Sequence, residues 1–226
     1  MAYKKRKHEP RLKPSHKTAR QKFAFYAIQL GALWNTVVFS DEKKFNLDGP
    51  DGWQFYWHDL RREEQSFFTR QNGGGGIMIW AAFSYHGKSE LRFISTTQKS
   101  GDYIYTLSEY MLPFAHLHYG LDFQFQQDNA PIHTSRETKS WLEEQGVTML
   151  EWPSMSPDLN PIENLWGILA RRVYANGRQY HSLEDLKKAI IKCWSEIDQN
   201  TLKSLVRSMP ERCREVLEKK GGKTRF

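Results

Sequence analysis

Two stretches, QDNAPIH at residues 127–133 and PDLNPIENLW at residues 157–166, decide how this 226-residue chain folds. Alternating apolar and polar residues lead into Asp128 and predict a short strand that ends there. The second stretch predicts a helix start, because Asn160 is a preferred N-cap residue, a proline follows at the first helical position and Glu163 falls in the first turn. The 34 residues between the two acids leave room for a crossover helix and one more strand, which would bring both carboxylates to one end of a mixed sheet.

A third acid, Asp41, lies upstream in VVFSDEKKF at residues 37–45. Period-two alternation places Asp41 on a mostly apolar strand face with Val37 and Phe39, and it places Glu42 on the other face. A carboxylate on an apolar face is costly unless a metal, a hydrogen-bond donor or a counter-charge compensates it. We therefore choose Asp41 over Glu42. Three converging carboxylates would make a site for hard divalent cations.

Each of these residues also has an ordinary structural interpretation. Asp41 alone fits a salt bridge to a buried Lys or Arg, and Asp128 fits a turn. Glu163 fits a capping box with Asn160. His133 either orients DNA or a water molecule, or is a structural histidine. Joint spacing, rather than any single residue, supports the metal site.

The net charge of +7 is unevenly distributed along the chain. Residues 1–22 carry nine Lys or Arg against one Glu, and residues 203–226 carry eight against three. The segment between them holds 16 Lys or Arg against 22 Asp or Glu. The basic ends indicate contact with a polyanion. The acidic centre would need bound metal before it could accept phosphate. Basic ends that only promote solubility are the alternative.

Composition excludes some classes of protein. No run of 18 apolar residues is present, so a membrane-spanning helix is not expected, and neither is a membrane partner. Cys193 and Cys213 lie in helix-like segments and fit buried thiols in a reducing compartment better than a disulfide. His116 and His118 have no third ligand nearby in the sequence and fit surface positions. The glycines at 73–76 predict a hinge or a close backbone approach, not a nucleotide-binding loop, so no organic cofactor is expected.

The expected elements are strands and helices in a definite order. Antiparallel strands come first, then a helix, a strand, a helix, a strand, a long helix and two further amphipathic helices. The expected strands are 37–45, 53–57, 77–83, 89–95, 123–127 and 147–152. The expected helices are about 15–33, 101–117, 135–145, 161–175, 182–197 and 200–219.

We expect three regions. Residues 1–22 would be a basic linker with a pattern similar to a nuclear-import signal, residues 23–199 a catalytic domain with an inserted loop at about 58–76, and residues 200–226 a C-terminal helix and basic tail.

The element order is that of the ribonuclease H-like fold, an α/β fold with a mixed five-stranded sheet flanked by helices. More narrowly, the chain resembles the catalytic domain of Tc/mariner superfamily DNA transposases, in its Tc branch. The matching segments are FSDE at 39–42, the glycines before the strand at 77–83, QDNAPIH at 127–133, and WP at 152–153 through SPDLNPIENLW at 156–166.

The resemblance implies that Asp41, Asp128 and Glu163 are the catalytic and metal-binding acids. It implies two Mg²⁺ ions, replaceable by Mn²⁺, with Asp41 bridging both ions while Asp128 and Glu163 each hold mainly one. It further implies hydrolysis at transposon ends, followed by attack of the freed 3′-hydroxyl on target DNA at TA. Candidate DNA contacts are Asn129, His133, Arg61, Arg62 and Arg70.

The resemblance also implies partners and a location. These are double-stranded DNA from transposon ends and target, a second copy of the chain in the DNA complex, and the nucleus. Family members carry an N-terminal helix-turn-helix region that is not seen here, so we expect an isolated catalytic domain or a shortened descendant. Two alternatives remain: a nuclease acting on RNA–DNA hybrids, and a domesticated protein that binds DNA without cutting it.

Overall fold

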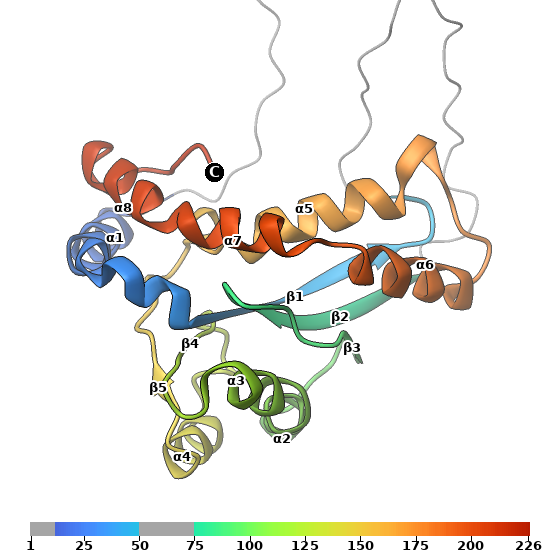
Figure 1. Ribbon diagram of the computed structural model, residues 1–226, viewed down its shortest axis with the longest axis horizontal. Helices are drawn as coiled ribbons and strands as arrows, with labels where there is room; N and C mark the ends of the chain where they lie inside the picture. Colours follow the sequence, from blue (N-terminus) through green and yellow to red (C-terminus); the bar gives the residue numbers. More distant parts are fainter. Residues whose placement is uncertain (1–11, 50–74) are drawn as a thin grey trace, which may run out of the picture.

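The computed structural model describes residues 12–49 and 75–226, and these form a five-stranded sheet covered by helices on both faces (Figure 1). The strands are Val37–Asn46 (β1), Gly76–Phe83 (β2), Arg92–Ile94 (β3), Gln124–Gln126 (β4) and Thr148–Met149 (β5). Their order in the sheet is β3-β2-β1-β4-β5. β1 pairs antiparallel with β2 and parallel with β4, while β2–β3 is antiparallel and β4–β5 parallel. The sheet is therefore mixed, as predicted.

The helices follow the predicted order. The α-helices are Pro14–Ala27 (α1), Ser100–Thr106 (α2), Leu112–Tyr119 (α3), Arg136–Glu144 (α4), Ile162–Val173 (α5), Leu183–Ser195 (α6), Gln199–Arg207 (α7) and Met209–Glu218 (α8). Short 3-10 segments are Ile28–Thr36 (η1), Pro157–Leu159 (η3) and Ala175–Gly177 (η4), and a π-helical turn, Leu107–Met111 (η2), joins α2 to α3. No helix of the described residues is long and apolar enough to span a membrane.

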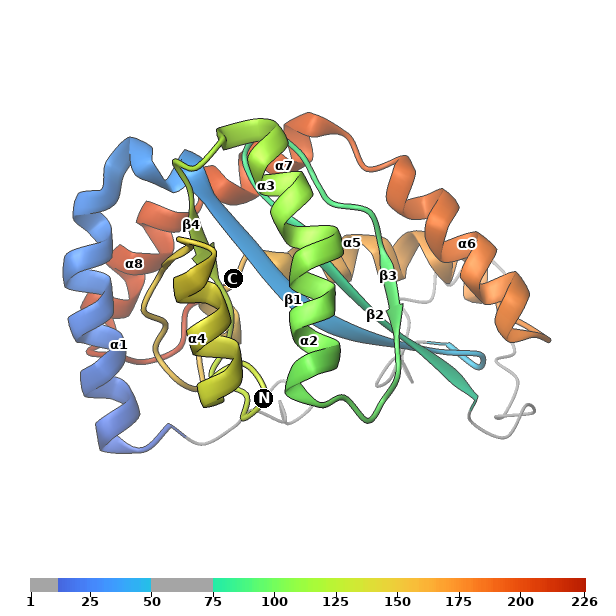
Figure 2. The same ribbon diagram turned by 90° about the horizontal axis from the view of Figure 1, so that it is seen from below.

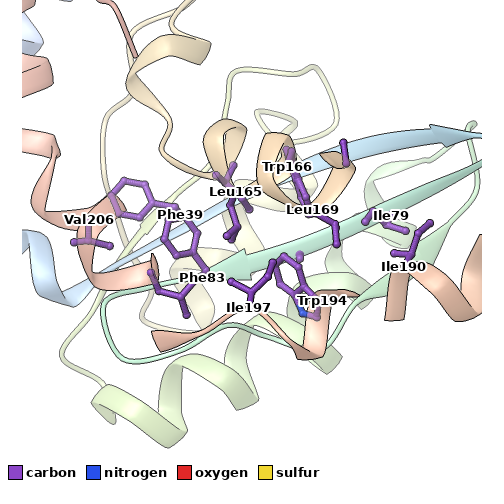
Figure 3. Close-up of a cluster of buried hydrophobic side chains, with 14 of the residues drawn as sticks. Phe39, Ile79, Phe83, Leu165, Trp166, Leu169, Ile190, Trp194, Ile197 and Val206 are labelled. Atoms are coloured by element: carbon purple, nitrogen blue, oxygen red, sulfur yellow. The ribbon is translucent and has the colours of Figure 1, made fainter. Parts of the chain in front are cut away.

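β1 separates two hydrophobic cores. Phe39 and Phe45 face a large cluster formed with α5, α6, α7 and α8, whereas Val38 faces a smaller cluster formed with α2, α3 and α4. Figures 1 and 2 show these two groups of helices on opposite faces of the sheet, with α1 beside α8 at one end. In Figure 3, Leu165, Trp166 and Leu169 of α5 lie over the strands. The apolar stripe of α5 is buried throughout: Ile162, Leu165, Trp166, Leu169 and Val173.

Two predicted strands are shorter in the structure. The segment 89–95 is paired as a strand only at Arg92–Ile94, and 147–152 only at Thr148–Met149. Both are edge strands of the sheet, where one side has no neighbouring strand to extend the pairing. The predicted close backbone approach is observed at Gly76, where a Cβ atom would lie 2.9 Å from the carbonyl oxygen of Phe45.

Three predicted helices differ in detail. The helix expected at 15–33 ends at Ala27 and continues as η1, which is broken at Gly31 with φ 51°. The helix expected at 200–219 is two helices, because Pro210 lies in the first turn of α8, where its missing N–H is tolerated. The helix expected at 101–117 is helical throughout but contains the π-helical turn η2.

Residues 14–22, which we placed in the basic linker, are helical, in agreement with the overlapping expectation of a helix from about residue 15. They belong to α1, and Arg20 in this helix is completely buried. The basic composition misled us because Arg20 makes an ion pair with Asp158 instead of facing solvent. The import-like pattern at residues 4–11, the strand 53–57 and the inserted loop up to residue 74 lie outside the described residues.

Candidate active site

A cavity of about 410 Å³ lies where β1, the end of β4 and the start of α5 meet. Asp41, Asp128 and Glu163 all line it. The remaining lining residues are Asn129, Ala130, Trp152, Pro153, Ser154, Met155, Ser156, Pro157 and Asn160. The three acids chosen from sequence spacing thus share one pocket, although they come from segments more than 30 residues apart.

Asp41 lies in the middle of β1, opposite Ala81 of β2. Trp166 of α5 donates a hydrogen bond from Nε1 to Oδ2 of Asp41, over 3.0 Å. Burial raises the pKa of Asp41 well above its usual value, and the negative charges of Glu163 and Glu42 raise it further. The hydrogen bond from Trp166 only partly offsets this increase.

Glu163 is delivered by the turn that begins α5. Asn160 accepts a hydrogen bond from the Ile162 N–H through Oδ1 (3.3 Å) and donates one through Nδ2 to the carbonyl oxygen of Ser40 (3.1 Å). Asn160 thereby joins the helix start directly to β1, next to Asp41. Burial raises the pKa of Glu163, partly offset by Lys43. Among the hydrogen bonds of the described residues, none joins the Glu163 carboxylate to the Asn160 N–H, so the capping-box interpretation is not supported.

Asp128 follows β4 and differs from the other two acids. Its Oδ1 accepts from the Ala130 N–H (2.9 Å) and lies 2.7 Å from Nδ1 of His133. The contact with His133 lowers the pKa of Asp128, against the opposing effect of burial. Asp128 therefore already has a cationic partner within the chain.

His133 lies behind Asp128 and is buried, with 4% of its side chain exposed. Its Nε2 is 3.4 Å from Oε1 of Glu42, and its ring stacks on Tyr103 at a centroid distance of 4.1 Å. Burial would lower the pKa of His133, but the contacts with Asp128 and Glu42 outweigh it and raise the pKa to about 9. This position favours the structural role for His133 that the sequence left open.

The structure describes only one of the other residues predicted to contact DNA. Asn129 is exposed at the pocket, where Nδ2 donates to the carbonyl oxygen of Trp152 (2.9 Å). Arg61, Arg62 and Arg70 lie outside the described residues. DNA contact by all of them stays a prediction.

Two observations define what the acids can hold. In residues 12–49 and 75–226, no three His, Cys, Asp or Glu side chains are close enough to form a ready metal cluster. Within the same residues, neither Asp41 nor Glu163 forms an ion pair with Lys or Arg. The pocket thus contains the oxygen atoms of three carboxylates, and among the described residues no arginine or lysine is paired with two of them, Asp41 and Glu163.

Sequence reasoning missed several supporting residues. Nothing in the sequence predicts the hydrogen bond from Trp166 to Asp41, and the choice of Asp41 leaves Glu42 without a role. Period-two alternation correctly separated Asp41 from Glu42, but it does not show that the opposite face of β1 meets His133. Two other predictions have clear outcomes: His116 and His118 are exposed as expected, and both cysteines are free thiols, although only Cys213 is buried and Cys193 is partly exposed.

Comparison with known proteins agrees with this geometry. The family described as DDE superfamily endonuclease matches residues 36–187. The chain is 47% identical over 212 residues to the Tc3 transposase of Caenorhabditis elegans, covering 94% of this chain and 64% of that protein. It is 36% identical to the Tcb2 transposase of Caenorhabditis briggsae, covering 96% of this chain and 81% of that protein. The chain therefore spans less than two thirds of the Tc3 transposase.

Solved structures show the same fold. The catalytic domain of Mos1 mariner transposase superposes with a TM-score of 0.76 at 17% identity, covering 96% of this chain and 98% of that one. A Mos1 paired-end complex with the left transposon end superposes with a TM-score of 0.82 at 20% identity, covering 99% and 68%. Further Mos1 structures contain Mn or Mg. The predicted ribonuclease H-like fold is confirmed.

Proposed function

The chain belongs to the DDE superfamily endonuclease family and is a relative of the Tc1-type transposases, and from this membership we propose that it is the catalytic part of a cut-and-paste DNA transposase. It would hydrolyse a phosphodiester bond at each transposon end and join the freed 3′-hydroxyl to target DNA, at TA dinucleotides. Asp41, Asp128 and Glu163 would be its catalytic residues.

One observation carries the proposal. The three acids belong to elements that are far apart in the sequence, yet they line one cavity beside the middle of β1 and the end of β4. The raised pKa values of Asp41 and Glu163 mean that their ionised forms are disfavoured until a positive charge arrives. An ordinary salt-bridge network would already supply that charge from within the chain.

The donor set fits a hard divalent cation. All three side chains offer carboxylate oxygens, which suit Mg²⁺ and Mn²⁺. Two such ions, when bound, would supply activation of the attacking oxygen and stabilisation of the charge on the leaving oxygen. Because the acids do not form a ready cluster, we expect their side chains to adjust when metal and DNA bind.

The chain itself would hold these acids in place. Trp166 holds one oxygen of Asp41, and Asn160 joins the start of α5 to β1. Nδ1 of His133 lies within hydrogen-bond distance of Asp128, and its Nε2 lies 3.4 Å from Oε1 of Glu42, so His133 would orient Asp128. Water would attack first and the freed 3′-hydroxyl second, both in line with the scissile bond, so no covalent enzyme intermediate is needed.

The partners and location are part of the proposal. Solved Mos1 structures include a paired-end complex with a transposon end and a strand-transfer complex, which supports double-stranded DNA as the partner here. We propose that two copies of the chain act together on DNA, and that they do so in the nucleus.

A nicking and joining assay tests the function. Full-length protein would be incubated with supercoiled plasmid and with a duplex that carries a free 3′-hydroxyl, in Mg²⁺, Mn²⁺ or EDTA. We expect metal-dependent nicking and joining, reduced more than about a hundredfold in Asp128→Asn. The matched control is Asp122→Asn, which changes an exposed acid of the same segment.

The same assay separates the alternatives. Cleavage of an RNA–DNA hybrid without joining of duplex DNA would indicate a hybrid nuclease. DNA binding with no cleavage in either metal would indicate a domesticated binding protein. Equal activity of Asp128→Asn and wild type would contradict the assignment of the acids.

A further inference from the structure

Asp158 is held by a buried arginine at the turn that leads to Glu163. It lies in η3, and only 9% of its side chain is exposed. Arg20 of α1 donates from Nη1 to Oδ1 of Asp158 (2.8 Å) and from Nη2 to Oδ2 (2.7 Å). A bidentate pair of this kind fixes the orientation of the carboxylate as well as its position. The turn is therefore attached to α1.

The C-terminal tail completes this attachment. The carbonyl oxygens of Gly221 and Gly222 accept from Arg20 (3.1 and 3.0 Å), and the Thr224 N–H donates to Oδ2 of Asp158 (2.8 Å). Gly221 has φ 80°, and a Cβ atom there would collide with the backbone of Lys17 in α1. Only glycine allows the tail to lie so close to the helix.

Arg212 of α8 spans the residues on either side of Glu163. Its Nη1 donates to the carbonyl oxygen of Asp158 (2.7 Å), and its Nη2 donates to Oδ1 of Asn164 (2.6 Å). The side chain is almost completely buried, and its Nε donates to Ser208 within α8. One guanidinium thus joins the η3 turn to the first turn of α5.

We propose that Arg20 and Arg212 are positioning residues for the Glu163 carboxylate. They attach the turn to α1 and α8, whereas Asn160 joins the same turn to β1. A buried ion pair generally stabilises a fold little more than apolar residues of the same size would. Stability alone therefore does not explain two buried arginines here, whereas a need to hold the turn in one defined position does. The inference rests on the proposed function, because it concerns where Glu163 lies in the metal-binding pocket.

The test uses changes on both sides of one hydrogen bond. Asn164→Ala removes the acceptor of Arg212, Asn164→Asp restores an acceptor, and Arg212→Met removes the donor. Arg214→Met is the matched control, because Arg214 lies on the same helix and pairs with Glu211 at the surface. Asn164→Ala keeps the test valid if Arg212→Met does not fold. Two quantities are measured on full-length protein: amide hydrogen exchange over residues 162–166 without metal, and the dissociation constant for Mn²⁺.

We expect Asn164→Ala and Arg212→Met to exchange about tenfold faster and to bind Mn²⁺ about 10–100-fold more weakly. Asn164→Asp and Arg214→Met should match wild type in both. Unchanged exchange in Asn164→Ala would overturn the inference, and so would faster exchange with unchanged Mn²⁺ binding. If Asp41→Asn binds Mn²⁺ as well as wild type does, the proposed function fails, and hydrogen exchange alone still decides whether the arginines hold the turn.

Discussion

Asp158 and Glu163 stand five residues apart at the start of α5, and the fold surrounds them differently. Burial alone would raise the pKa of Asp158, but hydrogen bonds from Arg20 and Thr224 outweigh it and lower the pKa. Burial raises the pKa of Glu163, and only Lys43 opposes it. Asp41, across the pocket from Glu163, has a raised pKa for the same main reason. Two neighbouring acids therefore differ: the negative charge of Asp158 is compensated by Arg20 and Thr224, whereas that of Glu163 is opposed only by the nearby charge of Lys43.

The difference separates structure from function. Asp158 brings the tail, α1 and α8 together and has its positive charge supplied by the chain. Asp41 and Glu163 carry a cost in the folded protein that a cation from solution would relieve. Asp128 is intermediate, since His133 compensates it from within while its side chain remains 58% exposed to the pocket. The predictions below test this division.

The largest expected effect follows from removing the compensation of Asp158. Arg20→Met should lower the free energy of unfolding by about 3–5 kcal/mol, because a buried carboxylate loses its partner. Urea unfolding at pH 7 measures this change, with Lys22→Met, an exposed cation of the same helix, as the control. A loss below about 1 kcal/mol would mean that Asp158 does not depend on Arg20.

A second effect concerns His133 and should depend on pH. The folded pKa of about 9 is above the usual value of 6.5, so the stabilisation is complete below pH 6.5 and is lost as the pH rises through about 9. Its greatest size is roughly 3 kcal/mol.

The difference in unfolding free energy between wild type and His133→Gln should therefore shrink between pH 6 and pH 9.5, measured in EDTA. His116→Gln, which changes an exposed histidine, should show no such trend. A difference that stays constant over this range would show that the imidazolium form of His133 is not what the fold stabilises.

Divalent metal should stabilise the protein through the uncompensated acids. Mg²⁺ at ten times its dissociation constant should raise the free energy of unfolding of wild type by about 1.4 kcal/mol. Glu163→Gln should gain much less, whereas Glu137→Gln, a change in the first turn of α4, should gain as much as wild type. Thermal unfolding with and without Mg²⁺ measures the effect. Equal gains in Glu163→Gln and wild type would place the metal elsewhere.

The smallest effect has the opposite sign to that of Arg20→Met. The pKa values of Asp41 and Glu163 are raised in the folded protein. Their contribution to the free energy of unfolding is therefore complete at low pH and is lost as the pH rises through the folded pKa values. Asp41→Asn or Glu163→Gln should therefore stabilise the metal-free protein at pH 7 by about 1 kcal/mol while abolishing cleavage. Destabilisation as large as that of Arg20→Met would contradict the proposed difference between Asp158 and the two pocket acids.

Local sequence patterns predicted the elements that bear the acids, but not the contacts between residues far apart in the sequence. Alternation along β1 identified Asp41, and the helix-start signal at Asn160 placed Glu163 in the first turn of a helix, because both depend on neighbours within a few residues. The pairing of Arg20 with Asp158 joins residues 138 positions apart, so no local period reports it. Basic composition even suggested a linker there. The contact of Glu42 with His133 was missed for the same reason, since it arises only when β1 and the segment after β4 pack together.

The most direct test of the metal-binding site is anomalous diffraction from crystals of the full-length protein soaked in Mn²⁺. We expect a peak in the pocket, with carboxylate oxygens of Asp41, Asp128 and Glu163 as its ligands, and no such peak in crystals of Asp41→Asn. A pocket that stays free of Mn²⁺ at saturating concentration, or one filled by an arginine side chain, would contradict the assignment of these three acids.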